Sequence, residues 1–377
     1  HLGALTIDAA GAGAISLKNI GAVGDGGVKT GNVAIGNTTG TTGITFGGTI
    51  YETDATTTQT YNVKSGSNFT VNGGAIGFTS TNADITFVNG SLNLADDDHL
   101  TIKSEGGTIT LAGVGGNSSE TVTLLANRTG DTSANEKIVL NGNIGSGNQI
   151  AKVDFNANDG ITLSGNITTS NAGTASVTMT GAVTISGDVD IDTTASNQTI
   201  TFSSTIDGKA LTPDDDLTLD NGTGTTSFGG AIGNTVALTT LNIAQAAGST
   251  GAISLPQIGQ TDGTAGVSGS TNIGNSGGGQ ITFSSADTHF GGTTVLRSNN
   301  AVGYVFSATD PEVKTGSGKI TFHGGDSNSG EVNFSAGTLK VYSGSNGDIE
   351  FKGLIHSTSG AAADEVLTLD AGSGTVT

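Results

Sequence analysis

The sequence predicts an all-β fold: a right-handed, parallel β-solenoid, or β-helix, with little or no helix. The first observation is a triplet that returns along the chain, with Ile, Thr and Phe in that order. Because side chains alternate between the two faces of a strand, the outer residues of each triplet share one face. The second observation is the spacing, about ten to twenty residues, which gives units too short to bury a core alone.

Taken in chain order, the triplets mark the expected strands. The Ile-Thr-Phe copies lie at residues 44–46, 85–87, 200–202, 281–283 and 320–322. Close variants lie at residues 153–155, 161–163, 177–179, 217–219, 332–334 and 349–351. Val, Ile, Thr and Phe all favour strands. The best helix candidate, residues 235–247, fits a pair of strands equally well.

Gly, Asn, Ser and Asp separate the triplets and mark the expected corners. Asn89-Gly90, Asp159-Gly160 and Asn221-Gly222 are turn signals, because Gly and Asn tolerate positive φ. Such pairs also make β-hairpins, so a meandering antiparallel sandwich is the alternative fold. Most spacers are longer than two residues, which favours the solenoid.

Composition separates this chain from other glycine-rich classes. Gly contributes 63 of 377 residues and Pro only 3, and the absence of a Gly-X-Y period excludes collagen. Regularly placed β-branched residues argue against disorder. Cys is absent, so the fold uses neither disulfides nor thiolate metal sites. No apolar run is long enough to predict a membrane span.

The net charge of -20 narrows the expected partners. With 13 basic and 33 acidic residues, the chain lacks the cations that nucleic acids and anionic membranes require. An acidic surface keeps a protein soluble, or recruits divalent cations.

Two sequence segments are repeated far apart in the chain. The sequence of residues 217–225 recurs in similar form at 367–375, and that of residues 241–259 recurs at 5–21. Either the chain is a section of a longer repetitive protein, or its subunits stack end to end; both predict a rod or fibre. No shift in composition marks a boundary, so residues 1–377 are expected to form a single continuous β-solenoid, a section or subunit of a longer repetitive rod.

The wording of residues 217–243 supports a family resemblance. Leu-Thr-Leu-Asp-x-Gly-x-Gly-Thr is followed by Phe-Gly-Gly-Ala-Ile-Gly and Leu-Thr-Thr-Leu-Asn-Ile. This phrasing resembles the β-strand repeats of giant bacterial surface exoproteins, such as filamentous haemagglutinin and autotransporter passengers. The resemblance implies a cell-surface location and adhesion, but none of the family's functional residues can be placed on this chain.

Three aspartates are the candidate metal ligands. Asp188, Asp190 and Asp192 alternate with apolar residues, so a strand would direct all three carboxylates to one outward face. Together with an adjacent coil they could hold Ca²⁺, which takes six to eight oxygen ligands; a solvated acidic face is the alternative. The runs 96–98 and 214–216 carry the same two interpretations. No other cofactor is expected.

The residue inventory favours a non-enzymatic structural protein that forms a stiff rod or filament. The resemblance implies that this protein is extracellular, stands at a bacterial surface and has an adhesive role. Expected partners are copies of itself, joined end to end or laterally into fibres, and cell-surface or host glycans. The alternative is a carbohydrate-binding or polysaccharide-cleaving solenoid, which needs binding aromatics and paired carboxylates. The only Tyr residues are Tyr51, Tyr61, Tyr304 and Tyr342, and their spacing suggests no shared face. His323, near Asp326, is the histidine considered as a catalytic candidate, and a histidine at a corner or on the outward face is its other interpretation. An ice- or mineral-binding surface of Thr rows is a third possibility.

Overall fold

The structure is a computed structural model. It describes residues 2–9, 11–21, 30–54, 56–127, 135–147, 149–170, 176–209, 214–246, 251–260, 263–275, 278–298, 303–324, 331–334, 338–344, 347–357 and 366–377. The chain divides into two compact units, unit 1 (His1–Ala182) and unit 2 (Val183–Thr377). That residues 1–377 make one continuous solenoid stays a prediction.

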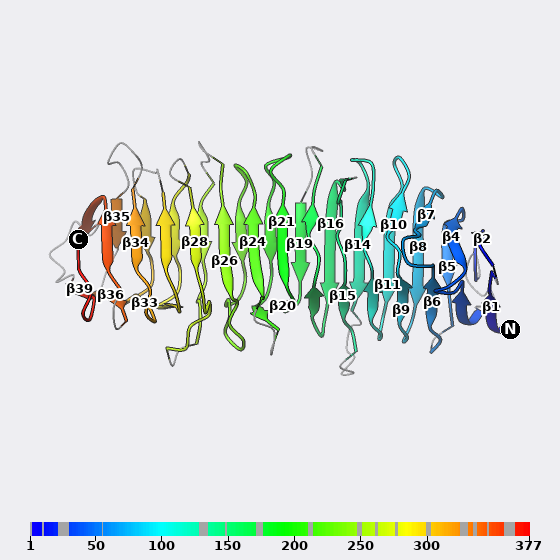
Figure 1. The fold of residues 1–377 in the computed structure, drawn as a ribbon, viewed down its shortest axis with the longest axis horizontal. Coiled ribbons are helices and arrows are strands. Elements are labelled where there is room, and N and C mark those ends of the chain that lie inside the picture. The colour runs from blue at the N-terminus through cyan, green and yellow to red at the C-terminus, as the bar shows by residue number, and fades with distance from the viewer. Residues whose placement is uncertain are drawn as a thin grey trace. The chain divides into compact units, whose positions relative to one another are not determined.

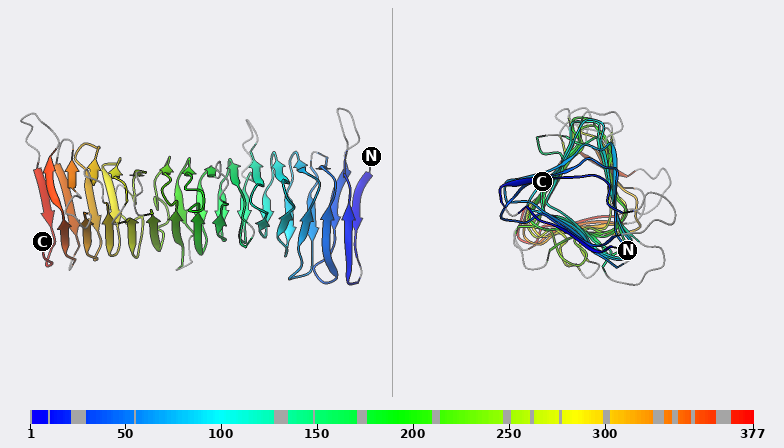
Figure 2. Two further views of the ribbon diagram at one scale, coloured as in Figure 1. Left: turned by 90° about the horizontal axis from the view of Figure 1, so that it is seen from above. Right: turned by 90° about the vertical axis from the view of Figure 1, so that its right-hand side faces the viewer.

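Each coil of unit 1 contributes a strand or a single bridge to each of three sheets, and the chain returns to the same sheet one coil later. In the right-hand view of Figure 2 the coils of this unit, blue to green, trace a three-sided outline. Sheet 1A contains β1 (Leu2–Ile7), β3 (Thr30–Ile35), β6 (Gln59–Asn62), β9 (Ile85–Val88), β12 (Ile109–Leu111), β15 (Ile138–Leu140) and β17 (Ile161–Leu163). Sheet 1B contains β2 (Gly13–Leu17), β4 (Thr41–Phe46), β7 (Phe69–Val71), β10 (Leu92–Leu94) and β13 (Val114–Gly115), with single bridges through Ile144 to β18 (Ile167–Thr168). Sheet 1C contains β5 (Ile50–Glu52), β8 (Ala75–Ser80), β11 (His99–Ser104), β14 (Thr121–Ala126), β16 (Lys152–Ala157) and β19 (Ser176–Thr180).

Unit 2 repeats the arrangement, and Figure 1 shows the strands of each unit side by side. Sheet 2A contains β20 (Val183–Ile185) and β23 (Ile206–Gly208), then bridges at Ile232 and Ile258, then β30 (Asp287–Phe290), β33 (Glu312–Thr315), β36 (Thr338–Ser343) and β39 (Val366–Asp370). Sheet 2B contains β21 (Asp188–Asp192), β24 (Asp216–Asp220), β26 (Thr240–Ala244), β28 (Thr271–Gly274), β31 (Thr294–Arg297), β34 (Ile320–His323) and β37 (Ile349–Lys352). Sheet 2C contains β22 (Ile200–Phe202), β25 (Thr226–Phe228), β27 (Ile253–Leu255), β29 (Ile281–Phe283), β32 (Tyr304–Phe306), β35 (Glu331–Phe334) and β38 (Leu354–Ser357).

The predicted fold class is confirmed. Within each unit, the strands that the structure describes pair in parallel, as β4 does with β7 and β21 does with β24. The described residues contain no helix, and the helix candidate at 235–247 supplies β26 instead. The antiparallel alternative is therefore wrong for these residues. Handedness stays a prediction.

The core of each unit is a set of apolar columns that run from coil to coil. In the five Ile-Thr-Phe triplets, both outer residues are buried, as Ile85 and Phe87 are in β9. Parallel register places like beside like, so one column of sheet 1B reads Ile44, Phe69, Leu92, Val114, Ile144, Ile167. Aromatic rings stack at the coil spacing: Phe283 and Phe306 have centroids 4.6 Å apart, and Phe322 and Phe351 4.9 Å.

The corners use the predicted turn residues. Asn89 has φ 69° and Gly222 has φ 59°. A Cβ on Gly222 would also lie 2.2 Å from Asn197 Oδ1 in the preceding coil, so both the backbone angle and the close approach require glycine there.

Candidate functional site

The three predicted aspartates lie together on one outward face of sheet 2B. On β21, Asp188, Asp190 and Asp192 alternate with the buried residues Val189 and Ile191. The alternation predicted from sequence is therefore present.

The next coil extends this acidic face. Asp216 on β24 stands beside Asp188, and Asp220 stands beside Asp192. Burial, and then the charges of Asp192 and Asp220, raise the pKa of Asp190 above its ordinary value. Burial and the Asp192 charge likewise raise the pKa of Asp220, against the lowering effect of a hydrogen bond from Gly222 N–H. Like charges directly opposite on neighbouring strands destabilise a sheet, so this face is electrostatically strained.

The geometry gives the calcium hypothesis no support. Among the residues that the structure describes, no group of three or more His, Asp or Glu side chains is arranged to hold a metal ion. Instead, Asp192 Oδ1 accepts hydrogen bonds from Thr194 N–H (2.8 Å) and from the Thr194 hydroxyl (2.6 Å). A Ca²⁺ role for Asp188, Asp190 and Asp192 stays an untested prediction.

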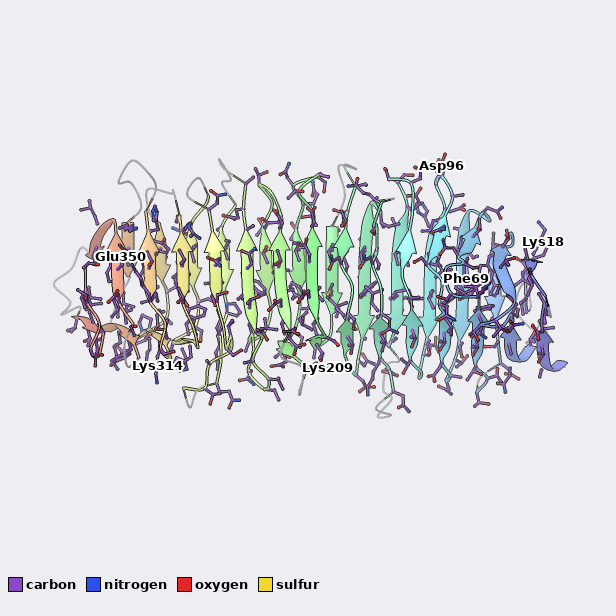
Figure 3. The ribbon with its side chains drawn as sticks, in the orientation of Figure 1. Lys18, Phe69, Asp96, Lys209, Lys314 and Glu350 are labelled. Carbon is purple, nitrogen blue, oxygen red and sulfur yellow. The ribbon has the colours of Figure 1, made fainter. Side chains whose placement is uncertain are left out.

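The other two aspartate runs join neighbouring coils. Asp98 Oδ1 accepts a hydrogen bond from Gly74 N–H at 2.6 Å, and Asp97 accepts one from the Ser119 hydroxyl at 2.9 Å. Figure 3 shows Asp96 on the loop that follows β10. Asp215 is 1% exposed and accepts hydrogen bonds from the backbone N–H groups of two other residues. These runs therefore tie the backbone together at corners.

Ties between coils recur along both units in a second form, which we call the corner staple. The side-chain oxygen of an Asn or Asp of one coil accepts a hydrogen bond from a backbone N–H of the following coil. Most of these acceptors lie at a corner, whereas Asn32 and Asp207 lie within strands. The pairs are Asn19–Thr49, Asn32–Thr58, Asn68–Ser91, Asp84–Thr108, Asn143–Asn166, Asn197–Thr223, Asp207–Thr235, Asp310–Thr338 and Asp348–Thr375.

The sequence contained a signal for these staples. In most of the pairs the Asn or Asp directly precedes the first buried residue of a strand or bridge, as in Asn68-Phe69, Asp84-Ile85 and Asn143-Ile144. An acceptor at that place can reach the first backbone N–H of the next coil.

Ionisable side chains also gather on sheet 2A. In register, His289 on β30 stands beside Lys314 on β33, followed by Tyr342 on β36 and Asp370 on β39. A cavity of about 400 Å³ is lined by Lys314, Tyr342 and Asp370 of this row and by Glu312.

The one histidine in this row is held internally. The His289 side chain is 3% exposed; its Nδ1 lies 3.0 Å from Gln260 O and its Nε2 lies 3.3 Å from Glu312 Oε1. Both neighbours are hydrogen-bond acceptors, and only an imidazolium can donate to both at once. With both nitrogens engaged and the ring buried, His289 is suited to joining coils rather than to proton transfer with a ligand.

A second row, on sheet 2B, carries basic side chains. Arg297, His323 and Lys352 stand in register on β31, β34 and β37. Beside them, Glu350 pairs with Lys319 Nζ at 2.8 Å; this hydrogen bond is the main reason why its pKa is lowered. Asp326, the acid expected near His323, lies outside the described residues.

Three of the four tyrosines are not available as a sugar-binding surface, because Tyr51, Tyr61 and Tyr304 are fully buried. Tyr342 is only partly buried and lines the cavity on sheet 2A. The prediction that the tyrosines share no outward face agrees with these positions, and an aromatic-lined cleft built from these three is not present.

Comparison with protein-family models, curated proteins and solved structures found no match to this chain. The resemblance to bacterial surface exoproteins therefore stays an expectation from the sequence. Within the described part of the chain, no helix has the length and apolar character to cross a membrane.

Proposed function

We propose that this chain is a non-enzymatic, extracellular structural protein, whose stacked coils form a stiff rod or filament at a bacterial surface with an adhesive role. The observation that carries the proposal is the in-register parallel pairing of successive coils within each unit. It directs backbone hydrogen bonds along the stacking axis and fills the interior with continuous apolar columns.

Stiffness follows from this arrangement. Bending a coil stack would stretch the axial hydrogen bonds on its outer side and compress the packed columns on its inner side, which have little free volume. The corner staples add a side-chain bond between coils where the backbone ladders are interrupted. Each coil contacts mainly its neighbours, which is the organisation of a solenoid.

The outer surface supports the adhesive part of the proposal. The register that builds the core also arranges outward side chains in rows, such as Thr101, Thr123, Asp154 and Thr178 on sheet 1C. A row of similar polar groups repeats the same weak contact at each coil. Repetition makes weak contacts cumulative, because each one raises the effective concentration of the next.

Electron microscopy and fibre diffraction of the purified chain, with and without a divalent-ion chelator, test the rod. We expect unbranched rods with a meridional repeat near ~4.8 Å, the spacing of stacked strands. Rods that dissolve in chelator would assign the aspartates of β21 to ion-linked joints, whereas resistant rods would remove that role. Compact particles without the axial repeat would refute the proposal.

A further inference from the structure

An uncharged groove crosses sheet 1B of unit 1, and it is the feature that deepens the proposed adhesive role. A cavity of about 320 Å³ is lined by Asn68, Ser91, Asn93, Gly115, Asn143 and Ser146, with the buried Val114 as its floor. A second cavity of about 330 Å³ shares Ser146 and continues past Gln149 and Thr168. We call the two together the amide groove.

The groove exists because a glycine replaces a side chain on one coil. In register, Asn93 on β10 stands beside Gly115 on β13. Because Gly115 has no side chain, this position leaves a hollow between the polar residues of the flanking coils.

Two of the groove amides are held in a defined orientation. Asn68 Oδ1 accepts a hydrogen bond from Ser91 N–H at 3.3 Å, and Asn143 Oδ1 accepts one from Asn166 N–H at 2.9 Å. Because a backbone N–H can only donate, the atom facing it must be the amide oxygen. Each NH₂ group is therefore the end that is left for a ligand, and its orientation is fixed in advance.

The lining chemistry selects one class of ligand. The chain carries a net charge of -20, yet none of the groove residues is charged, so neither an anion nor a metal ion finds its usual partners. A peptide strand has no free edge to pair with here, because the backbone N–H groups of Phe69, Leu92 and Val114 bond the next coil. Hydroxyl groups both donate and accept, which suits a row of amides and hydroxyls.

We infer that the amide groove binds a neutral oligosaccharide, laid along the coil axis of unit 1. The inference rests on the adhesive role proposed above and assigns it a place and a ligand class. The combined cavities match the size of small-molecule sites. The lining has no aromatic platform, so single-site affinity falls in the millimolar range, and useful attachment comes from many copies on one filament.

Side-chain amide NMR on the whole chain tests the inference. Cellohexaose, maltohexaose and laminarihexaose serve as neutral probes, and a hexagalacturonate as the anionic one, each to about 10 mM to populate a millimolar site. We expect at least one neutral hexasaccharide to shift the NH₂ signals of Asn68, Asn93 and Asn143. Asn93→Ala should weaken that binding about 5-fold, the effect of losing one hydrogen-bonding group.

Asn242→Ala is the matched control, because Asn242 is also a mid-strand outward Asn of a sheet, on β26 of unit 2. It should leave binding unchanged, and circular dichroism should show both variants folded. Three outcomes would each overturn the inference. They are no shift with any neutral probe, binding that Asn93→Ala does not weaken, and tighter binding of the hexagalacturonate than of the neutral probes. Microscopy of the same sample separates the two proposals. Rods without sugar binding would refute only the groove as a sugar site, whereas sugar binding without rods would refute only the filament.

Discussion

The aromatic cluster of unit 1 permits a demanding test of the packing argument. Phe46 is fully buried and its ring contacts five others: Tyr51, Phe78 and Tyr61 at centroid distances of 5.0, 5.0 and 5.1 Å, and Phe69 and Phe87 both at 6.2 Å. Replacing Phe46 by Ala removes most of a ring from the centre of this cluster and leaves a cavity that rigid neighbours cannot close.

The expected loss is large. Phe→Ala in a core lowers the free energy of unfolding by about 3–5 kcal/mol. The substitution also removes all the ring pairs that Phe46 makes, so we expect a loss in the upper half of this range, about 4–5 kcal/mol. For a unit of 182 residues, this corresponds to a fall in Tm of about 8–20 °C. Phe228→Ala is the control, because Phe228 is half-buried and its one ring partner is Phe202. We expect a loss of about 1 kcal/mol there.

Tyrosine fluorescence during urea unfolding measures the effect. The chain has no Trp. Two of its four tyrosines, Tyr51 and Tyr61, lie within the cluster and report on unit 1, whereas Tyr304 and Tyr342 report on unit 2, where Phe228 lies. A loss below about 2 kcal/mol for Phe46→Ala, or equal losses for Phe46→Ala and Phe228→Ala, would show that the columns are not packed as described.

Three further predictions test the corners and the acidic face. Gly222→Ala should destabilise unit 2 by at least about 1–2 kcal/mol in thermal unfolding, since it combines a positive φ with a clash against Asn197; an unchanged Tm would contradict the corner geometry. Glu120 is fully buried and accepts hydrogen bonds from Asn117 N–H and Ser119 N–H. Glu120→Ala should therefore lower the free energy of unfolding in urea by about 1.5–3 kcal/mol. Glu105→Ala is the control; it removes a surface ion pair with Lys103 and should lower that free energy by less than about 1 kcal/mol. The raised pKa of Asp190 means that folded unit 2 binds this proton more tightly than the unfolded chain does. Stability should therefore rise as the pH falls from neutral through the raised pKa, and be lost again as the pH rises; Asp190→Asn should stabilise unit 2 at pH 7 and flatten this dependence, and a variant that is less stable at pH 7 would refute the repulsion argument.

The fold class could be predicted because it depends on local patterns. A two-residue period identifies which residues of Ile-Thr-Phe are buried, wherever the triplet stands. The fully buried Gln59 could not be predicted in this way. It occupies an apolar column of sheet 1A and is accepted there because Tyr61 Oη donates to its Oε1 while its Nε2 donates to Thr79 O.

The candidate site shows the same limit. That Asp188, Asp190 and Asp192 share a face follows from strand geometry alone. That Asp216 and Asp220 stand beside them depends on coil register, which varies: Phe69, Leu92, Val114 and Ile144 are successive members of one column, although the spacing between them is uneven. The amide groove depends on register too. Gly115 leaves a hollow in the groove only because the register places it beside the side chain of Asn93.

The corner staples share a direction that bears on how the chain folds. In these nine pairs the acceptor belongs to the earlier coil and the donor to the later one, from Asn19–Thr49 to Asp348–Thr375. Described carboxylates that accept a backbone N–H from the earlier coil are fewer: Asp98, Asp159 and Asp215. A finished coil thus offers side-chain oxygens to a segment that has not yet been placed, and the incoming segment finds its bonding partner already fixed. Because solenoid structure propagates from neighbour to neighbour, this polarity makes each coil a template for its successor and favours folding that advances from the N-terminal side as the chain emerges.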